Sequence, residues 1–95
     1  MKVRYTPKSE ADLDSIFEYL NQRNAAAASD VLRSIRQQIA NLERSPFLGS
    51  PAKTVGVRNL TIVGYRYIVH YRVRRDEISV LHIRDTRRAP WTGAR

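Results

Sequence analysis

The chain has 95 residues, of which 42% are hydrophobic and 27% are charged, and it contains no cysteine. These values are typical of one small globular domain, and they exclude a disordered chain, a disulfide scaffold and a zinc site with thiolate ligands. We therefore expect a single domain over residues 1–95. The first twenty residues are too polar for a signal peptide and no apolar run could cross a bilayer, so we expect a cytoplasmic protein with no membrane partner.

The formal net charge is +8, and most of it comes from one part of the chain. Residues 53–75 carry six Lys or Arg and no Asp or Glu. A block of one sign makes a surface patch, which would attract nucleic acid or an acidic protein. The alternative is a solvated sheet edge that arginine keeps soluble.

The N-terminal part of the chain predicts a short strand followed by a helix. Residues 2–6 are β-branched or aromatic at several positions and are followed by Pro7. Thr6 and Pro7 suit the N-cap and first position of a helix over residues 7–23. Apolar residues then recur with the spacing of one helix face, at Leu13, Ile16, Phe17 and Leu20.

A second helix is predicted over residues 25–42. Asn24 can cap this helix, which begins with four alanines, and its apolar residues keep the helical spacing. Because few residues separate the two helices, they should form an antiparallel hairpin. Residues 45–56 contain two prolines and two glycines, so we expect a loop there.

The remaining pattern has a period of two and predicts three strands, over residues 57–62, 65–74 and 78–84. In the middle strand the tyrosines alternate with arginines, so we expect Tyr67 and Tyr71 to face the core. The inward face of the last strand is ambiguous, because Val80 and Leu81 are adjacent. The predicted fold is α+β, in the order β-α-α-β-β-β, with a helical hairpin on one face of a mostly antiparallel sheet.

Few residues in the chain could carry acid–base chemistry. Two histidines without cysteine are too few for a metal site, and no motif for a cofactor occurs, so we expect neither. RNA cleavage would need a proton-transfer group, for which His82 or His70 could serve, and cations that stabilise the phosphorane; His82 with Arg66 and Arg84 are the candidate set. No acidic residue lies close to His82 in the sequence except Asp85, so no proton relay is evident.

Several segments, in order, give the chain a resemblance to the RelE/ParE toxin superfamily of type II toxin–antitoxin systems. They are SEADLDSIFEYL (9–20), the helical residues 25–42, SPFLGSP (45–51), RNL (58–60), YRYIVHYRV (65–73) and ISVLHIRDTRR (78–88). The long helical hairpin and the D-L-x-x-I start of the first helix favour the ParE-like branch.

The resemblance implies a toxin that inhibits DNA gyrase, arrests growth and is neutralised by an acidic, ParD-like antitoxin in a hetero-oligomer. One alternative is a RelE-like, ribosome-dependent mRNA endonuclease that uses Arg66, His82 and Arg84. A further alternative is a basic nucleic-acid-binding domain without toxicity. On the favoured interpretation no residue is catalytic.

Two sets of binding residues follow from charge and from the residue types common at interfaces. The candidates for contact with the target are Arg84, Arg87, Arg88 and Trp91. The candidates for contact with the antitoxin are Leu13, Phe17, Leu20, Arg58, Arg66 and Arg72.

Overall fold

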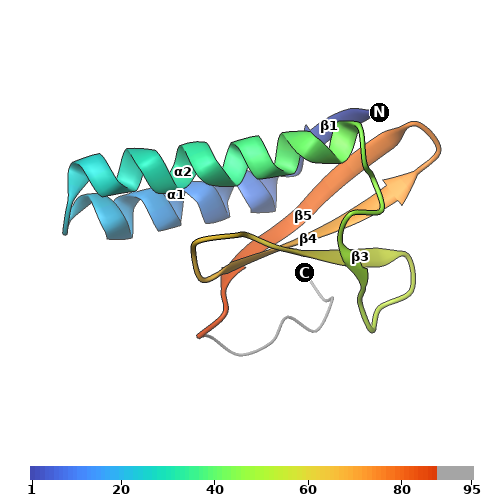
Figure 1. Ribbon diagram of the computed structural model, residues 1–95. Helices are drawn as coiled ribbons and strands as arrows, with labels where there is room; N and C mark the ends of the chain where they lie inside the picture. Colours follow the sequence, from blue (N-terminus) through green and yellow to red (C-terminus); the bar gives the residue numbers. More distant parts are fainter. Residues whose placement is uncertain (88–95) are drawn as a thin grey trace.

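The computed structural model describes residues 1–87, which form a layer of two helices packed on a five-stranded sheet (Figure 1). The strands are β1 (Lys2–Tyr5), β2 (Ser50–Pro51), β3 (Val57–Thr61), β4 (Tyr67–Arg74) and β5 (Glu77–Asp85). The helices are α1 (Pro7–Asn21), α2 (Ala25–Ala40) and a 3-10 turn, η1 (Asn41–Glu43). The predicted α+β fold is confirmed.

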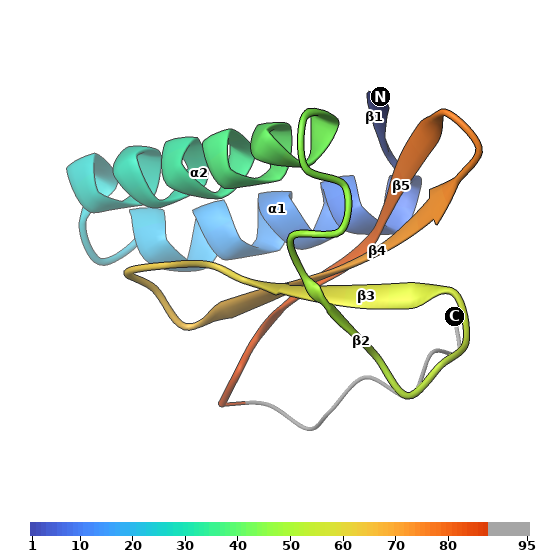
Figure 2. The same ribbon diagram turned by 45° about the vertical axis from the view of Figure 1, so that its right-hand side comes forward.

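The strand order is β1-β5-β4-β3-β2, and only the pairing of β1 with β5 is parallel. The first strand of the chain therefore lies beside the last described one. Both helices cover the same face of the sheet, and no described helix covers the other face, which we call the open face (Figure 2).

Local capping explains where the helices begin. The Thr6 side chain accepts a hydrogen bond from the backbone N–H of Ser9 at 3.2 Å, and Pro7 occupies the first helical position, where no N–H is needed. Asn24 caps α2 in the same way, through the N–H of Ala27 at 3.0 Å. These caps stabilise the start of each helix by roughly 1 kcal/mol.

The core lies between the helices and the sheet. It includes Leu13 from α1, Ile35 and Ile39 from α2, and the two tyrosines that were predicted to face inward, Tyr67 and Tyr71. The boundaries of the predicted elements differ from the observed ones by at most two residues. The larger differences are the short strand β2 inside the predicted loop 45–56 and the turn that occupies the start of the predicted strand 65–74.

A β-bulge resolves the ambiguity in the last strand. His70 pairs with His82, but the next residue of β4, Tyr71, pairs with Val80, so Leu81 is an extra residue. The bulge shifts the alternation by one residue at this point. Val80 and the later Ile83 are therefore both buried in the core.

The two faces of the sheet differ in charge. Strand alternation places five cationic residues on the open face, at Lys2, Arg4, Arg72, Arg74 and Arg84. Arg66 lies just before β4, where its carbonyl accepts from the Thr86 N–H at 2.8 Å, and we call these six residues the basic face. Glu77 also lies on this face and forms an ion pair with Arg4 at 3.4 Å. None of the helices among residues 1–87 is both long and apolar enough to cross a membrane.

Candidate functional site

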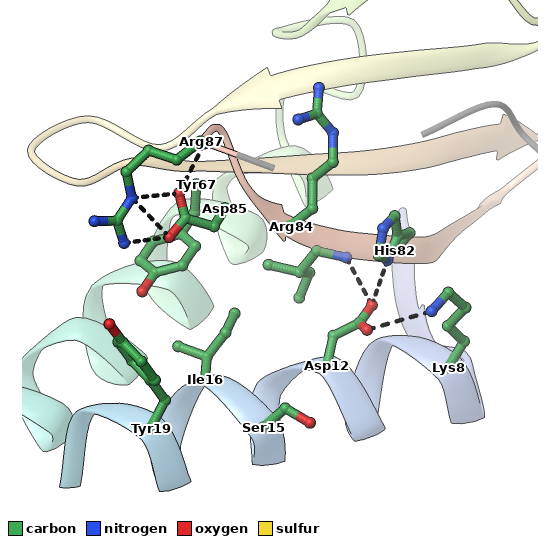
Figure 3. Close-up of a pocket in the computed structure, with 11 residues that line it drawn as sticks. Lys8, Asp12, Ser15, Ile16, Tyr19, Tyr67, His82, Arg84, Asp85 and Arg87 are labelled. Carbon is green, nitrogen blue, oxygen red and sulfur yellow. Dashed lines mark hydrogen bonds and ion pairs between the residues drawn. The ribbon is translucent and has the colours of Figure 1, made fainter. Parts of the chain in front are cut away.

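A groove of about 680 Å³ runs between α1 and the C-terminal half of β5 (Figure 3). It begins where β1 ends, because there the edge of β5 is covered by side chains of α1 instead of by another strand. Its lining combines apolar, aromatic and charged groups: Lys8, Asp12, Ser15, Ile16, Tyr19, Tyr67, His82, Ile83, Arg84, Asp85 and Arg87.

Asp12 fastens α1 to the edge of β5. Its Oδ2 accepts a hydrogen bond from the backbone N–H of Ile83 at 2.9 Å and lies 2.6 Å from Nδ1 of His82. A carboxylate only accepts, so Nδ1 of His82 carries the hydrogen. The sequence neighbours of His82 pointed to no proton relay, but the structure gives His82 an acidic partner that comes from α1, 70 residues earlier in the chain.

His70 lies beside His82 and is held as a neutral imidazole. Its Nε2 accepts a hydrogen bond from Nε of Arg84 at 3.1 Å, so its Nδ1 carries the hydrogen and donates to Oδ1 of Asn59 at 2.6 Å. Burial, followed by the nearby charges of Arg84 and His82, lowers the pKa of His70 to about 4. The two histidine rings stack, with centroids 5.7 Å apart. His70 is thus unsuited to proton transfer near neutral pH.

Two of the three candidates for RNA cleavage come together, and the third lies further along the sheet. Arg84 and His82 are on the same strand and both line the groove. Arg66 is exposed and lies just before β4, where its carbonyl accepts from Thr86 N–H at 2.8 Å.

The candidates for antitoxin contact differ widely in exposure. Leu13 is only 1% exposed, so its assignment to a binding surface is wrong: the same helical spacing that singled it out places it in the core. Leu20 is partly buried and packs against the core, whereas Phe17 is 39% exposed. Arg72 is half-buried on the open face.

Arg58 has a structural contact that the sequence did not indicate. Its guanidinium donates to the carbonyl of Gly49 at 2.6 Å through Nη2 and at 3.1 Å through Nε, and also to the carbonyl of Phe47 at 3.3 Å. It therefore holds the loop before β2 against β3. Because these N–H donors are already in use, fewer donors of Arg58 remain for a hydrogen bond to a partner.

The candidates for target contact are only partly covered by the structure. Arg87 lines the groove, and its guanidinium forms an ion pair with Asp85 on the same strand end. Arg88 and Trp91 lie outside the described residues.

Sequence reasoning missed Asp12 and Asn59, because each was explained equally well by a solvated helix face or a strand end. It also missed Gln38, whose side-chain amide bonds both the N–H and the C=O of Val63, at 2.8 and 3.1 Å. No local signal identifies these residues, since each partner lies at least eleven positions away.

Comparison with known proteins agrees with this architecture. A family model described as the ParE toxin of the type II toxin–antitoxin system parDE matches residues 3–90. A protein of Sinorhizobium fredii (strain NBRC 101917 / NGR234) named "Putative toxin Y4kP" is 29% identical over 83 residues, which are 85% of this chain and 86% of that protein. A solved structure of the chromosomal ParDE toxin–antitoxin system from P. aeruginosa superposes with a TM-score of 0.82 at 28% identity, covering 90% of this chain and 95% of that one. The chain therefore belongs to the ParE family of toxins from type II toxin–antitoxin systems.

Proposed function

We propose that this ParE-type toxin inhibits DNA gyrase in the cytoplasm and is neutralised by a cognate acidic antitoxin with which it forms a hetero-oligomer. The observation that carries the proposal is the state of His70. This imidazole is neutral and both of its ring nitrogens are hydrogen-bonded, to Asn59 and Arg84, so His82 is the one histidine that could transfer a proton. RNA cleavage needs both a base and an acid, so the site supports binding of a target better than it supports acid–base catalysis.

Binding residues for the target are Arg84 and Arg87 among the described residues, together with Arg88 and Trp91. Arginine and tryptophan are over-represented among the residues that dominate interface energies. Changing Arg87, Arg88 and Trp91 to alanine should abolish growth arrest on expression, while circular dichroism confirms that the variant folds. Full toxicity of that variant would remove the end of the chain from the mechanism.

For the antitoxin, the accessible candidates are the exposed Phe17 on α1, the exposed Arg66 just before β4 and the half-buried Arg72 on the open face. Leu20 and Arg58 would contribute their remaining exposed surface. An acidic segment would be attracted to the arginines by charge, and its association rate would fall with salt. Changing Arg66 and Arg72 to glutamate should weaken antitoxin binding in a titration, and unchanged affinity would contradict this assignment.

The alternative function, ribosome-dependent mRNA cleavage, is favoured by one observation. Asp12 orients His82 at the groove, and Arg84 is nearby, which is an arrangement that could move a proton and stabilise a phosphorane.

Two assays on the purified chain separate the two functions: DNA supercoiling by gyrase, and mRNA cleavage on translating ribosomes. Blocked supercoiling with intact mRNA supports gyrase inhibition. Cleaved mRNA with normal gyrase activity supports the nuclease, and His82→Gln should then abolish cleavage.

A further inference from the structure

Charge is divided between the two layers of the molecule. The helix layer, residues 6–44, has five Lys or Arg and six Asp or Glu, so it is close to neutral. The basic face of the sheet has six cationic residues on β1, β4 and β5 and just before β4, with the acid Glu77 on the same face. The excess positive charge of the described chain is thus concentrated on one side.

Most of these cations are not neutralised within the protein. Among residues 1–87, no carboxylate lies within 4 Å of the guanidinium groups of Arg66, Arg72, Arg74 or Arg84. By contrast, Arg33 and Arg36 of the helix layer are each paired with an acid. The open face therefore has cations available for an anionic partner.

One of these arginines is held in place before any partner binds. Nε of Arg84 donates to His70, and His70 is fixed in turn by Asn59, so the guanidinium plane is oriented while its terminal nitrogens remain available as donors. His70 stays uncharged near neutral pH, since its pKa is about 4, and does not repel Arg84. A fixed guanidinium loses less conformational entropy when it binds phosphate.

We infer that the basic face binds the sugar–phosphate backbone of duplex DNA directly. Side chains on one face of a strand recur every two residues, roughly 6.8 Å apart, which is twice the rise of about 3.4 Å per phosphate along one DNA strand. Arg72 and Arg74 are separated by one such step, and Arg66 lies six residues before Arg72, just ahead of β4. Arg84, on the neighbouring strand, widens the row of cations.

The open face favours a duplex over a single strand or a peptide. Binding of single-stranded nucleic acid usually needs aromatic side chains on which bases stack. Tyr67 and Tyr71 are instead buried on the helix side of the sheet. An amphipathic peptide would need an apolar surface, and on β4 the alternation places only Ile68 on this face. A phosphate backbone needs only the cations that are present.

This inference rests on the proposed function. In the cell, the toxin would contact the DNA that gyrase holds as well as gyrase itself. Because the proposed antitoxin contacts include Arg66 and Arg72, the antitoxin and DNA would compete for the same face.

The direct test is fluorescence anisotropy of a labelled mixed-sequence duplex of about 30 base pairs, titrated with the full chain at several salt concentrations. With four phosphate contacts, affinity should fall on the order of 100-fold between about 50 and about 200 mM NaCl. Arg72→Gln with Arg74→Gln should reduce the logarithmic salt slope by about two. The matched control, Arg33→Gln with Arg44→Gln, changes the net charge equally on the helix layer and should leave the slope unchanged.

Equal loss of affinity in the two double variants would overturn the inference, because it would mean that net charge alone attracts DNA. Tighter binding to a single strand of the same length would also overturn it. Gyrase supercoiling, measured in parallel, separates the two ideas. Gyrase inhibition without duplex binding rejects the inference and keeps the proposed function. Salt-dependent duplex binding without gyrase inhibition keeps the inference and rejects the proposed function.

Discussion

Replacing Asp12 with alanine should destabilise the protein strongly, because this carboxylate replaces a neighbouring strand at the edge of β5. Its Oδ2 receives both the Ile83 N–H and Nδ1 of His82, and the Asp12 and His82 side chains are each only 15% exposed. A hydrogen bond to a charged group contributes about 1.5–3 kcal/mol. Two such bonds, weakened by partial access of water and by the better helix propensity of alanine, give an expected loss of about 2–3 kcal/mol in the free energy of unfolding. In a domain of this size the melting temperature should fall by roughly 10–20 °C.

Urea denaturation followed by circular dichroism at neutral pH measures this loss. Asp12→Asn is the informative intermediate: both bonds go to Oδ2, so an amide oxygen can accept both, and what is lost is the charge and the exposed contact of Oδ1 with Lys8. We expect it to cost about 1 kcal/mol. Asp14→Ala, at an exposed position of the same helix, is the control and should change stability by less than about 0.5 kcal/mol. If the Asp12→Ala variant is no less stable than this control, the carboxylate does not hold α1 to β5.

Three other positions give independent tests. Gly49→Ala should destabilise the fold by about 2 kcal/mol or more, because the added Cβ would lie 2.4 Å from the backbone oxygen of Asn59; an unchanged urea midpoint would contradict this close approach. Gln38→Ala removes both bonds to the Val63 backbone and should cost about 1 kcal/mol while speeding amide hydrogen exchange in the β3–β4 turn, with exchange elsewhere as the internal control. The pKa of His70 is lowered from 6.5 to about 4, so the unfolded chain binds more protons than the folded chain between these values, and stability should fall as pH decreases from 6.5 to 4. His70→Gln should flatten that part of the stability curve, and a slope equal to that of the unmodified chain would argue against a neutral buried imidazole.

The parts of the fold that depend on neighbouring residues could be predicted from the sequence. Helical spacing, the caps at Thr6 and Asn24, and the inward tyrosines of β4 all depend on residues within a few positions of one another, and the structure confirms them. The period with which apolar residues recur also shows which face of a helix or strand is apolar. It led correctly to the core position of Tyr71, but the same reasoning was misapplied when Leu13 was assigned to a binding surface.

The candidate site could be predicted much less well, because it depends on long-range neighbours. The Asp12–His82 contact requires that β5 lie beside α1, and the register at His82 depends on the bulge at Leu81. Neither follows from alternation of polar and apolar residues. Likewise, the hydrogen-bonded chain from Asn59 through His70 to Arg84 joins three strands, and its existence depends on the order in which the strands pair.

The parallel pairing of β1 with β5 has a consequence for the order of events during synthesis. Residues 2–5 are synthesised before their partners, residues 77–80, which follow only after more than seventy further residues. Until then β1 has no strand beside it, and α1 lacks the strand that carries Ile83 and His82. The helical hairpin can form early from local contacts, whereas the sheet closes late. A nascent chain therefore acquires the groove and the complete basic face together, once β5 has been synthesised, and a product that stops before residue 77 should possess neither.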